Sequence, residues 1–112
     1  MTIYKKFCAL LFLVSGVVSA ASFDCLRVTG TDEKAVCANR QLSDLDVEMA
    51  VKYHWLSGLA GMGVAGDMRD SQQLWLQKRS ACGGDTDCLH TLYLQRIQAL
   101  NRIYDAIPKP VI

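Results

Sequence analysis

The stretch DTDCLHTLYLQRIQALNRIYDAI, residues 85–107, decides the fold. A mainly apolar stripe recurs through it at helical spacing, made by Leu89, Leu92, Tyr93, Arg96, Ile97, Leu100, Ile103, Tyr104 and Ile107. This period predicts a helix that buries one face in a core. Asp85 or Thr86 can cap its start, and Pro108 and Pro110 end the pattern.

Three more helices are predicted upstream. Ser43 is a suitable cap for a long helix, with Asp46 at the capping-box position, and its apolar stripe contains Leu45, Met49, Tyr53, Leu56 and Ala60. Asp67–Ala81 predicts another long helix, ended by the Gly83-Gly84 pair, and a short helix is expected over about Asp32–Ala38. Because no segment alternates with period two, the predicted fold is all-α: a small disulfide-stapled helical bundle of one short and three longer helices.

The segment Ser57–Gly66 is rich in glycine and apolar residues. Glycine in a helix interior costs about 1 kcal/mol relative to alanine, so the first interpretation is a mobile apolar loop between two helices. The alternative is a pair of helix turns with a Gly-x-x-Gly face that another backbone can approach.

The first residues have the order of a secretory signal peptide. Lys5 and Lys6 precede the apolar run Phe7–Val18, and small residues follow it. We expect a signal peptide over residues 1–20, with cleavage after Ala20 or Ala21. An apolar run of this length rises about 18 Å as a helix, too little for a hydrocarbon core of about 30 Å, so no membrane anchor is expected after cleavage. The exported chain is expected in the periplasm, with the extracellular space as the alternative.

Composition indicates one small globular domain. The 112 residues include 12 Lys and Arg against 11 Asp and Glu, which gives a formal net charge of +1 and no polybasic surface for nucleic acid. We expect a monomer or a weak dimer, without a cofactor.

Four cysteines remain after Cys8 is lost with the signal peptide. Their number predicts two disulfides in an exported chain, and the lower entropic cost of closing short loops favours Cys25–Cys37 and Cys82–Cys88. Zinc is the competing interpretation, but the spacings differ from the paired Cys-x2-Cys of zinc ribbons, so no metal site is expected.

Six short blocks are specific when taken as a set. In the first half they are Ser22-Phe23-Asp24-Cys25, EKAVCA at 33–38 and LSDLD at 42–46. In the second half they are Gln73-x-Trp75-Leu76-x-x-Arg79-x-x-Cys82, Cys88-Leu89 and Tyr93-x-x-Arg96-Ile97-x-x-Leu100. Together, over about Phe23–Leu100, they resemble a bacterial secreted family, the lysozyme inhibitor LprI N-terminal-like domain. The resemblance implies a helical periplasmic domain over residues 21–112 with two local disulfides, and it suggests lysozyme inhibition.

Four residues of the second-half blocks are candidates for the core or for a partner surface. We expect Trp75 and Tyr93 to be core aromatic residues on facing helices. We expect Arg79 and Arg96 to form buried or half-buried ion pairs with one of three carboxylates: Asp24, Asp44 or Asp46. The alternative for all four is contact with a partner.

No residue set in the sequence matches a catalytic motif, so we predict a binding protein and not an enzyme. The predicted partner is a lysozyme-like muramidase whose cleft is occupied by the apolar residues Leu59 and Met62, with Asp85 and Asp87 on cationic residues at the rim. The alternatives are an immunity protein against a peptidoglycan-cleaving toxin and a non-inhibitory envelope interaction or stress module.

Overall fold

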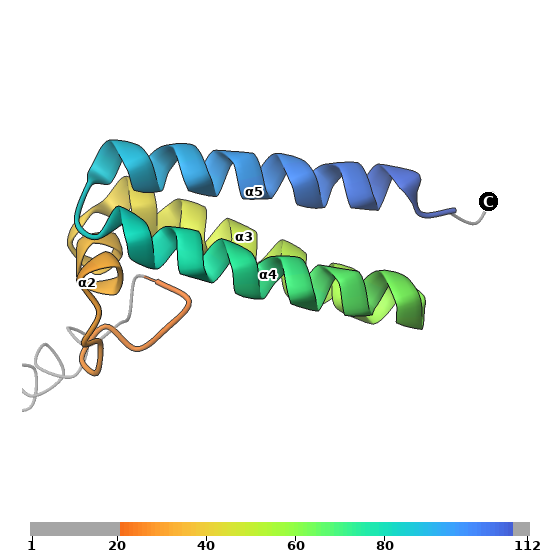
Figure 1. Cartoon of the computed structure of the whole chain (residues 1–112), viewed down its shortest axis with the longest axis horizontal. Helices are drawn as coiled ribbons and strands as arrows, with labels where there is room; N and C mark the ends of the chain where they lie inside the picture. Colours follow the sequence, from red (N-terminus) through yellow and green to blue (C-terminus); the bar gives the residue numbers. More distant parts are fainter. Residues whose placement is uncertain (1–20, 109–112) are drawn as a thin grey trace, which may run out of the picture.

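The computed structural model describes residues 21–108, and the predicted signal peptide lies outside them. The described part contains four helices and no strand: α2 (Thr31–Ala38), α3 (Arg40–Leu59), α4 (Met62–Cys82) and α5 (Thr86–Ala106). The three long helices lie side by side, and the short α2 lies at the end where α4 turns into α5 (Figure 1). The predicted all-α bundle of one short and three longer helices is confirmed.

The core runs along the inside of the three long helices. Its largest fully buried side chains include Tyr93, Leu89 and Leu100 of α5. The other helices contribute the buried residues Val36, Leu42, Met49, Leu56, Met68 and Trp75. The stripe predicted for residues 85–107 therefore packs against every other helix of the bundle.

Two disulfides hold the α2 end of the bundle, as predicted. Cys25–Cys37 joins the irregular lead-in segment to the last turn of α2, with 5.8 Å between the Cα atoms. Cys82–Cys88 bridges the α4–α5 turn, with 5.7 Å between the Cα atoms. Both loops are short, and each disulfide contributes on the order of 2–3 kcal/mol in the chain-entropy description.

The predicted start of α3 is wrong. The helix begins at Arg40, and Asn39 caps it by accepting a hydrogen bond from the amide of Leu42 at 3.1 Å. Ser43 lies inside the helix, fully buried, and its hydroxyl donates to the carbonyl of Val36 at 2.6 Å. Asp46 therefore belongs to no capping box, and its side chain is free to enter the core.

The predicted loop over Ser57–Gly66 is also wrong. Only Ala60 and Gly61 separate α3 from α4, so almost all of this segment is helical. The alternative interpretation is confirmed only in part: the segment forms helix turns, but its glycines do not form a face against which another backbone packs. A Cβ atom added at three of these glycines would meet nothing within 4 Å, so no backbone packs against them: Gly58, Gly61 and Gly63.

Within residues 21–108, none of the helices combines the length and the apolar character that crossing a membrane requires.

Candidate functional site

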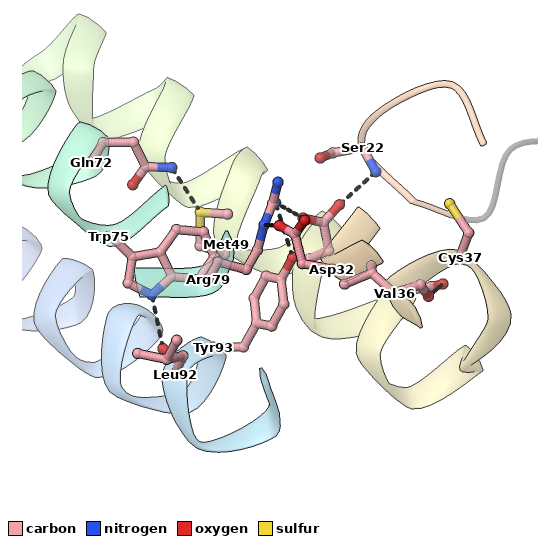
Figure 2. A network of polar contacts seen from close by, with 12 residues as sticks. Ser22, Asp32, Val36, Cys37, Met49, Gln72, Trp75, Arg79, Leu92 and Tyr93 are labelled. Atoms are coloured by element: carbon pink, nitrogen blue, oxygen red, sulfur yellow. Dashed lines mark hydrogen bonds and ion pairs between the residues drawn. The ribbon is translucent and has the colours of Figure 1, made fainter. Parts of the chain in front are cut away.

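A buried polar cluster joins all four helices at the α2 end. Asp32 of α2, Arg79 of α4 and Tyr93 of α5 point toward one another (Figure 2), and Asp46 of α3 contacts both Tyr93 and Arg79. The Nε of Arg79 donates to Asp32 Oδ2 at 2.7 Å, and the Nη1 of the same guanidinium donates to the Tyr93 hydroxyl at 3.4 Å. Tyr93 in turn donates to Asp46 Oδ1 at 2.8 Å, and that oxygen lies 3.9 Å from Arg79.

The second oxygen of Asp46 receives a hydrogen bond from outside the helices. The backbone amide of Ser22, in the lead-in segment, donates to Asp46 Oδ2 at 2.7 Å (Figure 2). Asp46 is 0% exposed, so both of its carboxylate oxygens accept hydrogen bonds from protein groups and not from bulk water. This contact links the start of the described chain to the second turn of α3.

Burial controls protonation inside the cluster. Burial, reinforced by the negative charge of Asp46, raises the pKa of Tyr93, so its hydroxyl stays protonated and donates. Burial lowers the pKa of Arg79, but contacts with Tyr93 and Asp32 outweigh it and the net direction is upward. Beside the two aspartates, Arg79 therefore keeps its positive charge and Tyr93 remains a neutral phenol.

Aromatic rings surround this cluster. Trp75 and Tyr93 pack edge to face, with ring centroids 4.9 Å apart, and the indole N–H donates to the carbonyl of Leu92 at 3.1 Å. The guanidinium of Arg79 lies over the rings of Phe23 and Trp75, 5.5 and 5.7 Å from their centroids. Trp75 and Tyr93 are buried on facing helices, so their side chains are part of the core, as predicted.

The ion-pair predictions need two corrections. Arg79 lies within ion-pair distance of Asp46, as predicted, at 3.9 Å, but its closest partner is Asp32, which the sequence does not predict. The other two predicted partners do not contact it: Asp24 pairs with Arg27, and Asp44 is exposed. In the sequence, Asp32 is typical of an acidic residue in the first turn of a helix, and nothing near it indicates that its side chain points into the core.

Arg96 has no carboxylate within ion-pair distance among residues 21–108, so its predicted ion pair is wrong. Its guanidinium donates to the side-chain oxygen of Gln72 at 2.9 Å, to the Ser71 hydroxyl at 3.1 Å and to the carbonyl of Met68 at 3.4 Å. These neutral acceptors leave its charge uncompensated, and burial lowers the pKa of Arg96. Arg96 thus joins α5 to α4 by hydrogen bonds alone.

The opposite end of the bundle carries exposed apolar side chains. Around the α3–α4 turn, Trp55 is 68% exposed, Leu59 59% and Met62 93%. Three further residues with substantial exposure lie near them, and we call the six together the apolar end: Val51, Trp55, Leu59, Met62, Val64 and Tyr104. Large apolar groups gathered at one place on a surface mark an interaction site more often than scattered ones do.

Two hollows shape the apolar end. One, of about 330 Å³, lies between α3 and α5 and is lined by Val51, Trp55, Leu59 and Tyr104 among others. The second, of about 460 Å³, lies at the end of the bundle between the α3–α4 turn and the last turn of α5. Leu59 lines both, so the two hollows adjoin and offer one apolar surface.

The four residues predicted for one partner surface lie at opposite ends of the molecule. Leu59 and Met62 flank the α3–α4 turn, whereas Asp85 and Asp87 lie at the α4–α5 turn (Figure 1). The 21 residues of α4 separate the two turns by about 31 Å. Asp85 also caps α5, accepting from the amides of Asp87 and Cys88. The acidic pair therefore cannot share one cleft with Leu59 and Met62.

Within the described chain, no group of three or more His, Cys, Asp or Glu side chains is arranged to hold a metal ion. Comparison with protein-family models, with curated proteins and with solved structures gives no match for this chain.

Proposed function

We propose that this is an exported binding protein that acts by occupancy and docks its apolar end on a protein partner. The observation that carries the proposal is the exposure of Trp55, Leu59 and Met62 beside two adjoining apolar hollows. Burying one such side chain gains about 1.5–3 kcal/mol, and tryptophan is enriched among residues that dominate binding energies.

The partner we propose is a lysozyme-type cell-wall hydrolase. Such enzymes act with two carboxylates in a cleft, and an inhibitor need only fill that cleft. The α3–α4 turn suits this use because it is narrow: two residues connect the helices, and Gly58 and Gly63 add no side chains beside Leu59 and Met62. The resemblance of the cysteine blocks to lysozyme-inhibitor domains supports the same partner.

Anchoring of the other end supports a rigid presentation of this turn. Both disulfides and the buried polar cluster lie at the α2 end, where they fix the positions of the long helices relative to one another. A rigid docking surface loses less entropy on binding than a flexible one.

The test is clearing of cell-wall suspensions by several purified muramidases, with and without an excess of the processed protein. We expect Met62→Glu to weaken inhibition about tenfold or more, because it places a charge in an apolar contact. The melting temperature should not fall, since Met62 is 93% exposed and an acid suits the start of α4.

Leu74→Glu is the matched control. Like Met62, Leu74 is a large apolar residue of α4 that is exposed, at 60%, but it lies about three helical turns from the apolar end. Its replacement should leave inhibition unchanged. If no muramidase is slowed, the hydrolase proposal is refuted. Protection against one peptidoglycan-cleaving toxin alone would instead identify an immunity protein.

A further inference from the structure

Within residues 21–108, the buried polar cluster has two acidic side chains and one basic side chain, so one positive charge is lacking. Asp32 and Asp46 are 6% and 0% exposed, and within residues 21–108 only Arg79 lies within ion-pair distance of them. Removing a carboxylate from water is costly unless a cation or several donors compensate it. Arg79 lies 2.7 Å from Asp32 but 3.9 Å from Asp46, whose hydrogen-bond donors are Tyr93 and the Ser22 amide.

We propose that the mature N-terminus supplies the missing charge: the α-ammonium released by signal-peptide cleavage binds Asp46. In the uncleaved chain, Ser22 contributes a neutral amide 2.7 Å from Asp46 Oδ2. Cleavage after Ala21 turns this same nitrogen into an ammonium. Cleavage after Ala20 places the ammonium on Ala21, the adjoining residue, which is only 9% exposed. Cleavage after Ala21 thus puts the positive charge on the atom that contacts Asp46, and cleavage after Ala20 puts it one residue further along the chain.

The consequence is that processing completes the polar cluster. A charge-assisted hydrogen bond is about twice as strong as a neutral one, so the cleaved chain is held more tightly at its start than the precursor. The lead-in segment also contains Cys25, which is bonded to Cys37 of α2. The contact between the N-terminus and Asp46 therefore helps to position the loop that this disulfide closes. This inference rests on the predicted cleavage and is independent of the partner.

The pH dependence follows from the groups around the ammonium. These are Asp46 of α3, Tyr93 of α5, Arg79 of α4 and Asp32 of α2. The adjacent carboxylate raises the pKa of the amine above its value in an unfolded chain, about 7.7–8.0. The added stability is then fully present below that range and is lost as the pH rises through the pKa of the folded state.

The experiment compares two preparations of the processed, disulfide-bonded protein, one with a free and one with an acetylated N-terminus. In the chain that starts at Ser22, an acetyl group takes the place that the acyl group of Ala21 has in the continuous chain, so acetylation removes the charge without a clash. At pH 6 we expect the free form to melt about 4–8 °C higher, and the difference to shrink above pH 9. Equal melting temperatures at pH 6 would overturn the proposal.

The matched variants are Asp46→Asn and Asp44→Asn, a buried and an exposed carboxylate of the same helix. Acetylation should lose its effect in Asp46→Asn and keep it in Asp44→Asn. Because Asp46→Asn can prevent folding, the pKa of the α-amine is also measured by NMR in the unsubstituted protein. A value in the range of an unfolded chain refutes the contact, and a raised value supports it. Intact mass identifies the N-terminus, so a failure of cleavage is told apart from a failure of docking.

Discussion

At the scale of single residues, Tyr93 is the centre of the molecule. Its hydroxyl accepts from Arg79 and donates to Asp46, and its ring packs against Trp75. It is 0% exposed, so a water molecule does not readily replace either hydrogen bond. Tyr93 therefore couples α3, α4 and α5 through one atom.

Tyr93→Phe tests this role. The substitution keeps the ring but leaves Asp46 without its phenol donor, and we expect it to lower the free energy of unfolding by about 1–3 kcal/mol. Urea denaturation at neutral pH measures the loss. Tyr104→Phe is the control because Tyr104 is 46% exposed and lies outside the buried polar cluster, and it should cost less stability than Tyr93→Phe.

The raised pKa of Tyr93 makes an alkaline prediction of its own. Above pH 10, its ordinary value, the unfolded chain releases the phenol proton while the folded chain keeps it. Stability should therefore fall as the pH rises from 10, and this slope should be shallower in Tyr93→Phe than in Tyr104→Phe. Equal slopes in the two variants would contradict a buried, protonated Tyr93.

Which residues lie near the core follows largely from the sequence, but which polar groups pair does not. The apolar stripe predicts the positions of Tyr93 and Trp75 because helical period is a local property. The choice of Asp32 over Asp24 or Asp44 for Arg79 depends on how α2 crosses the end of the bundle. Arg96 shows the same limit, since its acceptors Gln72 and Ser71 are neutral and carry no charge pattern.

At the scale of elements, the α4–α5 turn is fixed by three local devices. Gly83 has a positive φ of 58°, the Cys82–Cys88 disulfide spans the turn, and Asp85 caps α5. All three are local in sequence, which is why this turn was predicted correctly. The predicted start of α3 is wrong for a non-local reason. Ser43 is chemically suited to cap a helix, but its hydroxyl instead donates to the carbonyl of Val36, a contact that forms only when α2 packs against α3.

Gly83→Ala and Gly84→Ala form a matched pair at this turn. Gly83→Ala should lower the free energy of unfolding by about 1–3 kcal/mol, because its backbone conformation disfavours a Cβ atom. At Gly84 a Cβ atom would meet Thr31 Cγ2 at 3.6 Å, an ordinary contact, so Gly84→Ala should be nearly neutral. Thermal unfolding of both measures the difference, and equal losses would show that φ at Gly83 is not the controlling feature.

At the scale of the whole molecule, the two ends have different chemistry. The α2 end holds both disulfides and the buried polar cluster, whereas the apolar end leaves Trp55, Leu59 and Met62 in water. Of these three exposed residues, the sequence predicts Leu59 and Met62 as surface residues but not Trp55, which stands one residue before the core position Leu56 and outside the predicted stripe. The prediction that Asp85 and Asp87 belong to the same surface is wrong because α4, a helix of 21 residues, keeps them at the opposite end of the bundle.

Site-directed photo-crosslinking tests whether the apolar end is where the protein acts. A benzophenone side chain replaces Met62 in one preparation and Leu74 in another, and both are irradiated in envelope extract. Docking through the apolar end predicts a crosslink from position 62 to a lysozyme-type hydrolase and none from position 74. No hydrolase at position 62, or equal crosslinking from both positions, would contradict it.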